Sequence, residues 1–315
     1  TEFNTPIVRQ ELKDMDIEII AEGLGFPEGP VVMPDGSVIL VEIQRGTLTR
    51  VWDGKTEIIA EVGGGPNGAA LGPDGAMYVC NNGGFAWSEM AGYLLPGHAA
   101  ADYDTGRIER VDLSTGKVER IYDTVDGNML KGPNDLVFDK KGNFYFTDHG
   151  KSYARTRDLG GLFYASPDGA KVEELVWGQT SPNGVGLSPD ENTVYMADTM
   201  TGRLWAYDLA APGVVNAASP LQPGRIVSSL PGWTLLDSLA VEASGQIAVA
   251  TLVTGGITVF DLNGATQLIP FPDLLVTNIA FGGDDMRDAY VTLSGTGKLA
   301  KVRWPRPGLK LNFAG

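Results

Sequence analysis

The chain has 315 residues, a formal net charge of −15 and a single cysteine, Cys80. The strongly acidic balance argues against electrostatic binding of nucleic acid or of anionic membranes. One cysteine excludes an intrachain disulfide, a four-cysteine zinc site and a Cys-x-x-Cys motif. No run of about 18 apolar residues occurs, so we expect no membrane-spanning helix. We predict a cytoplasmic protein, because no disulfide requires an oxidising compartment; a removed signal peptide stays open because the chain starts at Thr1.

In chain order, a polar N-terminal extension at 1–16 precedes one isolated predicted strand at 17–21. Six copies of a strand–turn–strand unit follow, each with an apolar run, a turn rich in Asp, Gly or Asn, and a second apolar run. They occupy residues 27–42, 66–81, 131–150, 182–198, 236–251 and 277–292. A repeat of roughly 40–50 residues built from short strands indicates a β-propeller. We therefore predict an all-β protein, a single six-bladed β-propeller domain at 17–306 with four antiparallel strands per blade, and a C-terminal tail at 307–315.

The last copy is followed by only one more strand, which ends at Pro305-Arg306-Pro307. The isolated strand at 17–21 is thus predicted to complete the last blade and to close the ring. We predict no long helix. Two connections, 82–106 and 149–160, are long enough to be functional lids. Hairpin direction places both at the end of the channel where the first strand of each copy begins.

A polar residue stands at the start of the first strand in every copy. If these strands line the channel, their polar side chains form a ring of two carboxylates and four amides, which suits Ca²⁺, with Mg²⁺ or Mn²⁺ as alternatives. Any one of them could instead be a local turn former. Six at equivalent places weaken that interpretation for the set. The positions are Glu28, Asn67, Asn134, Asn183, Asp237 and Asn278.

Several motifs resemble the SMP-30/gluconolactonase/LRE family over nearly the whole chain. They are Pro-Glu-Gly-Pro at 27–30, Gly-Pro-Asn-Asp-Leu at 132–136, Tyr-Phe-Thr-Asp at 145–148, Ser-Pro-Asn-Gly at 181–184 and Thr-Asn-Ile-Ala-Phe-Gly-Gly at 277–283. The resemblance implies a six-bladed propeller with a divalent cation in its channel and, in most characterised members, lactonase activity. It implies Glu28, Asn134, Asn183 and Asp237 as metal ligands and Asp237 as the catalytic acid/base. The resemblance also allows Zn²⁺ or Fe²⁺ as the bound cation.

Two departures from the family pattern leave the substrate open. Asp237 is followed by Ser238 where the family often has glycine, and His149-Gly150 follows Thr147-Asp148 where a Pro-Pro-Tyr sequence is widespread. Substrate contacts are expected from the channel ring, the long connections and their neighbours. Each of these has a structural alternative. Asn82 and Trp87 could pack within their loop, Lys131 could be solvated, and His149 could be hydrogen-bonded only to backbone. The residues expected to bind substrate are Asn67, Asn82, Trp87, Lys131, His149 and Asn278.

We therefore predict a metal-dependent hydrolase that opens a small-molecule lactone, a sugar lactone or a related cyclic ester. The cation would polarise the carbonyl, and Asp237 would activate water or attack directly. There is no Gly-x-Ser-x-Gly elbow, no His-Glu-x-x-His motif and no phosphate-binding Gly-Lys-Ser/Thr loop. Two alternatives remain: an organophosphate triester hydrolase on the same metal, and a non-enzymatic calcium-binding propeller. The sequence indicates no oligomeric state.

Overall fold

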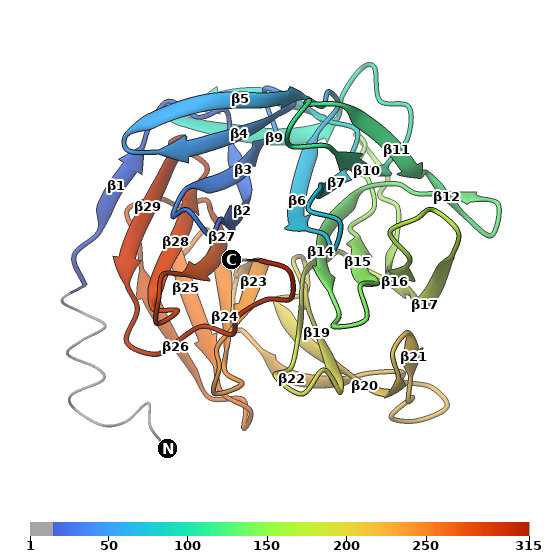
Figure 1. The fold of residues 1–315 in the computed structure, drawn as a ribbon. Helices are drawn as coiled ribbons and strands as arrows, with labels where there is room; N and C mark the ends of the chain where they lie inside the picture. Colours follow the sequence, from blue (N-terminus) through green and yellow to red (C-terminus); the bar gives the residue numbers. More distant parts are fainter. Residues whose placement is uncertain (1–14, 315) are drawn as a thin grey trace.

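A computed structural model describes residues 15–314, and every regular element in that range is a β-strand. Six antiparallel sheets surround a central channel (Figure 1), which confirms the predicted six-bladed propeller. The part of the predicted N-terminal extension at 1–14 lies outside the described residues. Within the described residues, no helix is long and apolar enough to cross a membrane. The cytoplasmic location stays a prediction.

Each blade runs outward from the channel through four strands. The innermost strands are β2 (Pro27–Val32), β6 (Pro66–Leu71), β14 (Pro133–Phe138), β18 (Pro182–Leu187), β23 (Leu235–Val241) and β27 (Val276–Gly282). The second strands are β3 (Val38–Glu42), β7 (Met77–Asn81), β15 (Phe144–Asp148), β19 (Thr193–Asp198), β24 (Ile247–Leu252) and β28 (Asp288–Leu293).

The outer half of each blade is more varied. The third strands are β4 (Thr47–Trp52), β10 (Arg107–Val111), β16 (Gly160–Ala165), β20 (Arg203–Ala211), β25 (Gly256–Phe260) and β29 (Lys298–Arg303). The outermost strands are β5 (Lys55–Glu61), β11 (Val118–Tyr122), β17 (Val172–Gln179), β22 (Arg225–Ser229), β26 (Thr266–Pro270) and β1 (Glu18–Ala21). The additional short strands are β21 (Val214–Val215), the hairpin β8 (Phe85–Met90) with β9 (Tyr93–Ala99), and the pair β12 (Thr124–Val125) with β13 (Asn128–Met129).

In blades one to four, an aspartate holds the turn between the first and second strands, as the repeat predicts. In blade three, Asp139 accepts hydrogen bonds from the backbone N–H groups of Lys141 and Asn143 at 2.8 and 3.1 Å. In blade four, Asp190 Oδ1 likewise accepts from Asn192 N at 3.0 Å in the turn between β18 and β19. An aspartate side chain that satisfies the backbone of its own turn fixes the turn, and hence the register of the two strands.

The ring closes as predicted, because β1 pairs antiparallel with β29, with Glu18 opposite Lys301. Apolar clusters shared by neighbouring blades join the sheets. Val137 and Tyr145 of blade three, for example, are packed in one buried cluster with Val185 and Met196 of blade four. Since each blade buries its faces against the next, the ring holds the six innermost strands in fixed positions around the channel.

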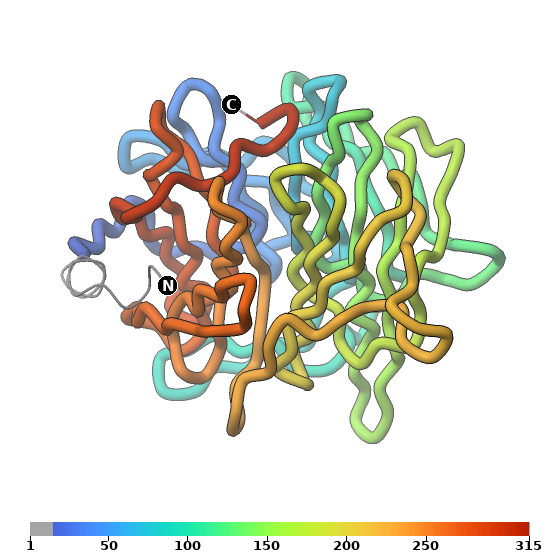
Figure 2. The backbone as a smooth tube through the Cα atoms, turned by 90° about the horizontal axis from the view of Figure 1, so that it is seen from below, coloured from blue at the N-terminus to red at the C-terminus, as the bar shows by residue number. Residues whose placement is uncertain are grey.

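The two ends of the channel are covered differently (Figure 2). At the end where the innermost strands begin, the connection 82–106 forms the hairpin β8–β9, whereas the sequence suggested only a loop. Leu94 N donates to Gly295 O of blade six and Ala99 N to Ser152 O of blade three, both at 2.9 Å. The predicted position of this lid is therefore confirmed. The C-terminal segment 305–314 crosses the opposite end (Figure 2).

Candidate metal centre and active site

The polar residues at the start of the innermost strands lie in the protein interior, as the repeat predicted. Glu28, on β2, is 2% exposed, and Asn134 and Asn183 are also buried. Asp237, on β23, is only partly buried. The ring therefore places ionisable and amide groups where water cannot solvate them, which requires compensating partners.

Glu28 lacks one of those partners. Its Oε2 accepts hydrogen bonds from Gly29 N at 2.5 Å and from Asn278 Nδ2 at 2.7 Å. Its Oε1 has no hydrogen-bond partner among the described residues, and the same holds for Oδ1 of Asn134. A buried carboxylate oxygen and a buried amide oxygen that are both left without donors fit a bound cation.

A hydroxyl network orients the neighbouring amide. Asn183 Nδ2 donates to Thr199 Oγ1 at 3.0 Å, and its Oδ1 accepts from Ser238 Oγ at 3.5 Å, so both ends of the amide are oriented. Thr147 Oγ1 donates to the backbone oxygen of Asn183 at 2.5 Å and accepts from Asp135 N at 3.2 Å. Thr147 of blade three thus connects the strand that carries Asn134 with the strand that carries Asn183.

Burial changes the acidity of three carboxyl groups near the channel. Burial, and then the charge of Asp237, raises the pKa of Glu28 well above its usual value. Burial raises the pKa of Asp237 to about 7, to which the charge of Asp135 adds while the hydrogen bond from Asn183 opposes it. Burial likewise raises the pKa of Asp135 to about 7. Without a cation, these carboxyl groups therefore keep their protons to unusually high pH.

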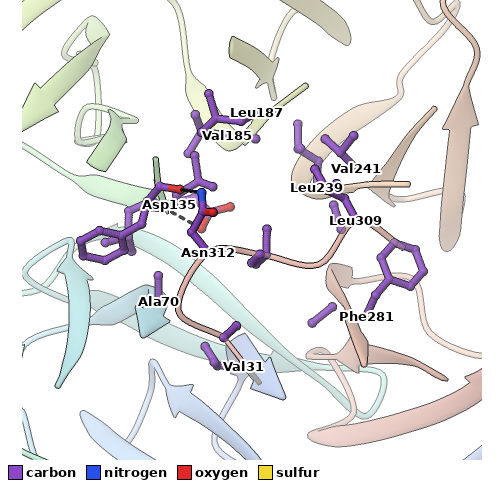
Figure 3. Close-up of a pocket in the computed structure, with 18 of the residues that line it drawn as sticks. Val31, Ala70, Asp135, Val185, Leu187, Leu239, Val241, Phe281, Leu309 and Asn312 are labelled. Atoms are coloured by element: carbon purple, nitrogen blue, oxygen red, sulfur yellow. Dashed lines mark hydrogen bonds between the residues drawn. The ribbon is translucent and has the colours of Figure 1, made fainter. Parts of the chain in front are cut away.

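Asp135 is a channel residue that the sequence did not mark as part of the site. Its Oδ1 accepts from Leu136 N at 2.9 Å, and its side chain faces the apolar part of the channel (Figure 3). Within residues 15–314, no three carboxylate, imidazole or thiol side chains converge on one point. Any cation held by Glu28 and Asp237 therefore needs amide oxygens to complete its coordination.

A buried lysine joins the lid to blade three. Lys151 is 1% exposed, and its Nζ donates to Asn82 Oδ1 at 3.0 Å and to Gly84 O at 2.6 Å. The same ammonium lies 4.0 Å from the centre of the Phe85 ring and 5.2 Å from that of Tyr103. Burial lowers the pKa of Lys151 to about 7. No local sequence pattern marks Lys151, because its partners lie far along the chain.

The predicted substrate residues of the lid are in structural contacts. Asn82 Oδ1 also accepts from Gly84 N at 2.8 Å, while its Nδ2 is buried without a partner among the described residues. The Trp87 ring lies 5.2 Å from the ring of Phe26, close to the start of β2, and packs against Phe85. Trp87 therefore fastens the lid over the first blade.

His149 follows β15 at the lid end of the channel, where its N–H donates to Gly132 O. Arg157 Nη2 lies 2.9 Å from His149 Nδ1 and donates to the His149 carbonyl oxygen at 2.6 Å. Burial, and then the charge of Arg157, lowers the pKa of His149 to about 3. The imidazole is therefore neutral at physiological pH and, since arginine only donates, accepts at Nδ1. A proton-shuttling role has no support in this arrangement.

The remaining predicted residues have varied surroundings. Asp148, at the end of β15, accepts from the backbone N–H groups of Lys131, Gly132 and Gly150, and so holds the chain before β14. Tyr103 Oη donates to the backbone oxygen of Lys131 at 2.8 Å, so Lys131 lies under the lid. Asn67 is buried at the start of β6 and Asn278 is bonded to Glu28. Substrate binding by these residues stays a prediction.

The sequence of this chain matches those of known proteins. The family model described as the SMP-30/Gluconolactonase/LRE-like region matches residues 26–295. A gluconolactonase of Zymomonas mobilis is 28% identical over 266 residues, 79% of this chain and 70% of that protein. A lactonase of Staphylococcus epidermidis is 33% identical over 152 residues, 48% of this chain and 45% of that protein.

Solved structures share the fold at lower identity. A gluconolactonase from Xanthomonas campestris superimposes with a TM-score of 0.74 at 20% identity, covering 96% of this chain and 94% of that one. A calcium-binding regucalcin from Agrobacterium tumefaciens gives 0.70 at 18% identity, covering 94% and 98%. The fold and the channel ring define a six-bladed propeller with an oxygen-lined centre. The protein belongs to the SMP-30/gluconolactonase/LRE-like family.

Proposed function

We propose that the protein is a metal-dependent hydrolase that opens a lactone at a divalent cation in the propeller channel. The observation that carries the proposal is the pair of buried, partnerless oxygens, Glu28 Oε1 and Asn134 Oδ1, at the same end of the channel as Asp237. The family and the lactonases among its relatives support a lactone as substrate. The sequence departures at Ser238 and His149 leave the identity of that lactone open.

The proposed ligands are Glu28, Asn134, Asn183 and Asp237. All four offer oxygen, and the two carboxylates would neutralise a divalent charge. Oxygen-only sets with few carboxylates favour Ca²⁺, and then Mg²⁺ or Mn²⁺. Zn²⁺ and Fe²⁺ bind more often where nitrogen or sulfur ligands are present. We therefore assign Ca²⁺ as the preferred ion, in line with the calcium-binding relative of the same fold.

The cation and the surrounding side chains would have different roles in opening the lactone. A bound divalent cation supplies Lewis-acid polarisation of the lactone carbonyl and stabilises the negative charge that develops on its oxygen. Asp237, the least buried of the four proposed ligands, takes a proton from the attacking water or attacks the carbonyl carbon itself. The Asn183 amide opposes the rise in the pKa of Asp237 and so favours its ionised form. The lid β8–β9 lies at the end of the channel where these ligands stand, and would limit the entry of water there.

Two matched substitutions test the proposal. Glu28→Gln and Asp237→Asn each keep an oxygen and remove one negative charge, so both should weaken Ca²⁺ binding measured by calorimetry. At saturating Ca²⁺, Glu28→Gln should regain much of its kcat. Asp237→Asn should remain about 10²–10⁴-fold slower, because it can neither accept a proton nor attack. Near-normal kcat for Asp237→Asn with metal restored would make Asp237 a ligand only.

The substrate class needs a separate measurement. Chelated protein, with each metal restored in turn, should be assayed against sugar lactones, simple γ- and δ-lactones and phosphotriesters. We expect metal-dependent lactone opening to exceed phosphotriester hydrolysis. A preference for phosphotriesters would identify the organophosphate alternative. Cation binding without turnover of either class would indicate a non-enzymatic propeller.

A further inference from the structure

A cavity lies in the channel beyond the proposed metal ligands, and Figure 3 shows residues that line it. Its volume is about 160 Å³. Its wall is formed by the middle and far parts of the innermost strands, and its floor by the C-terminal segment. Residues that line it include Val31, Ala70, Val185, Val241, Phe281 and Leu309.

The cavity is distinct from the lid-side mouth. It begins one or two residues beyond the proposed ligands in each strand, with Gly29 after Glu28 and Asp135 after Asn134. None of Glu28, Asn134, Asn183 and Asp237 lines it. Since the innermost strands run away from the lid, the cavity occupies the opposite half of the channel. The ring of proposed ligands therefore separates it from the place where substrate would enter.

The cavity has room because several strands carry small side chains there. Ala70, Ala240 and Ala280 come from blades two, five and six, and each is incompletely covered by protein. Two polar side chains line the ligand end, and both have partners within the protein. Asn278 donates to Glu28 and accepts from Ile279 N at 2.8 Å, and Asp135 Oδ1 accepts from Leu136 N at 2.9 Å. An apolar guest would therefore displace no hydrogen bond made by Asn278.

The C-terminal segment 305–314, here called the strap, closes the floor. At one side, Leu309 N donates to Val241 O at 2.9 Å and Gly308 N to Met286 O at 2.7 Å. At the other side, Asn312 Nδ2 donates to Phe138 O at 3.1 Å and to Glu191 Oε1 at 2.7 Å. The strap thus spans from blades five and six to blades three and four, and Leu309 faces the cavity (Figure 3).

We propose that this cavity, called the chamber below, binds one small apolar molecule, an aromatic hydrocarbon ring of the size of benzene. We propose also that the molecule enters and leaves by displacement of the strap. An apolar cavity of about 150 Å³ in another protein stays dry and binds benzene or xenon, and the volume here is similar. None of the proposed metal ligands lines this site, so binding there can be tested separately from the proposed hydrolase activity.

Benzene itself is the probe for the test. The Ca²⁺-loaded full chain should show a saturable rise in Tm with benzene, and methyl NMR signals of Val31 and Leu309 should shift with one-to-one stoichiometry. Ala70→Leu fills the chamber and should weaken benzene binding at least tenfold. Ala210→Leu makes the same change at an exposed strand position and should leave binding unchanged. Neither change should alter lactone turnover.

The role of the strap is tested by the rate at which bound and free benzene exchange. Asn312→Ala removes the hydrogen bonds at one end of the strap, so bound and free benzene should exchange severalfold faster in NMR line shapes. If Ala70→Leu fails to fold, Ala280→Leu narrows the same chamber from blade six. The proposal is overturned if no saturable binding occurs, or if both chamber-filling variants bind benzene as the unmodified chain does. A structure with benzene bound outside the chamber would overturn it equally.

Discussion

Removing the cation should make the stability of this protein depend steeply on pH. The pKa of Asp237 is raised from 3.8 to about 7 in the folded, cation-free chain. Between these values the folded state holds a proton that the unfolded state has released, so the free energy of unfolding falls as pH rises. About three pKa units at ~1.4 kcal/mol each give ~4 kcal/mol for Asp237. That figure is an upper value, because Asp237 is partly exposed at the channel mouth.

Glu28 shifts in the same direction, so the two carboxyl groups act together. A bound divalent cation favours their ionised forms, so with cation bound the free energy of unfolding should no longer fall as pH rises. Denaturant unfolding at pH 5 and pH 8, with chelator or with Ca²⁺, measures both effects. We expect Ca²⁺ to stabilise the protein by several kcal/mol more at pH 8 than at pH 5, following the carboxyl shift above. The Glu28→Gln/Asp237→Asn double variant should lose most of this difference.

Equal stability of the chelated protein at the two pH values would refute this reasoning. So would a Ca²⁺ stabilisation that does not change with pH, because the cation would then have no preference for the ionised carboxylates. Asp135 remains in the double variant and has a raised pKa of its own. A residual slope of the same sign is therefore expected there.

Three further predictions concern the lid, the histidine and the channel wall. Lys151→Met keeps the aliphatic stem but loses the hydrogen bonds to the lid, so KM should rise about tenfold with little change in kcat, and lid proteolysis should accelerate. His149 should show no NMR titration between pH 5 and 8, and Arg157→Met should raise its pKa; an inflection near 6.5 in the unmodified chain would contradict this assignment. Gly29→Ala should destabilise the fold by roughly 2 kcal/mol or more, because its φ is +50° and a Cβ would lie 2.6 Å from a backbone oxygen. Gly36→Ala, with φ +82° and open space, should cost only about 1–2 kcal/mol in denaturant unfolding.

The sequence by itself determined the architecture, because its signals are local. The Asp-centred turns and alternating apolar runs specify each hairpin from neighbouring residues alone, as Asp139 does for Lys141 and Asn143. Counting the copies then gave six blades, and the strand left over at each end predicted the pairing of β1 with β29. The ring of polar residues followed from the same count, since equivalent positions in a repeat face the same axis.

Tertiary structure alone decided the contacts between distant segments. Lys151 meets Asn82 across 69 residues, and Asn312 meets Phe138 across 174, so no local pattern could connect them. The partnerless oxygens of Glu28 and Asn134 were also beyond prediction, because a lone pair without a donor is recognised only once every neighbour is placed. The chamber was beyond prediction for the same reason. Its volume is set jointly by six strands and the strap, so it is known only once all of them are placed.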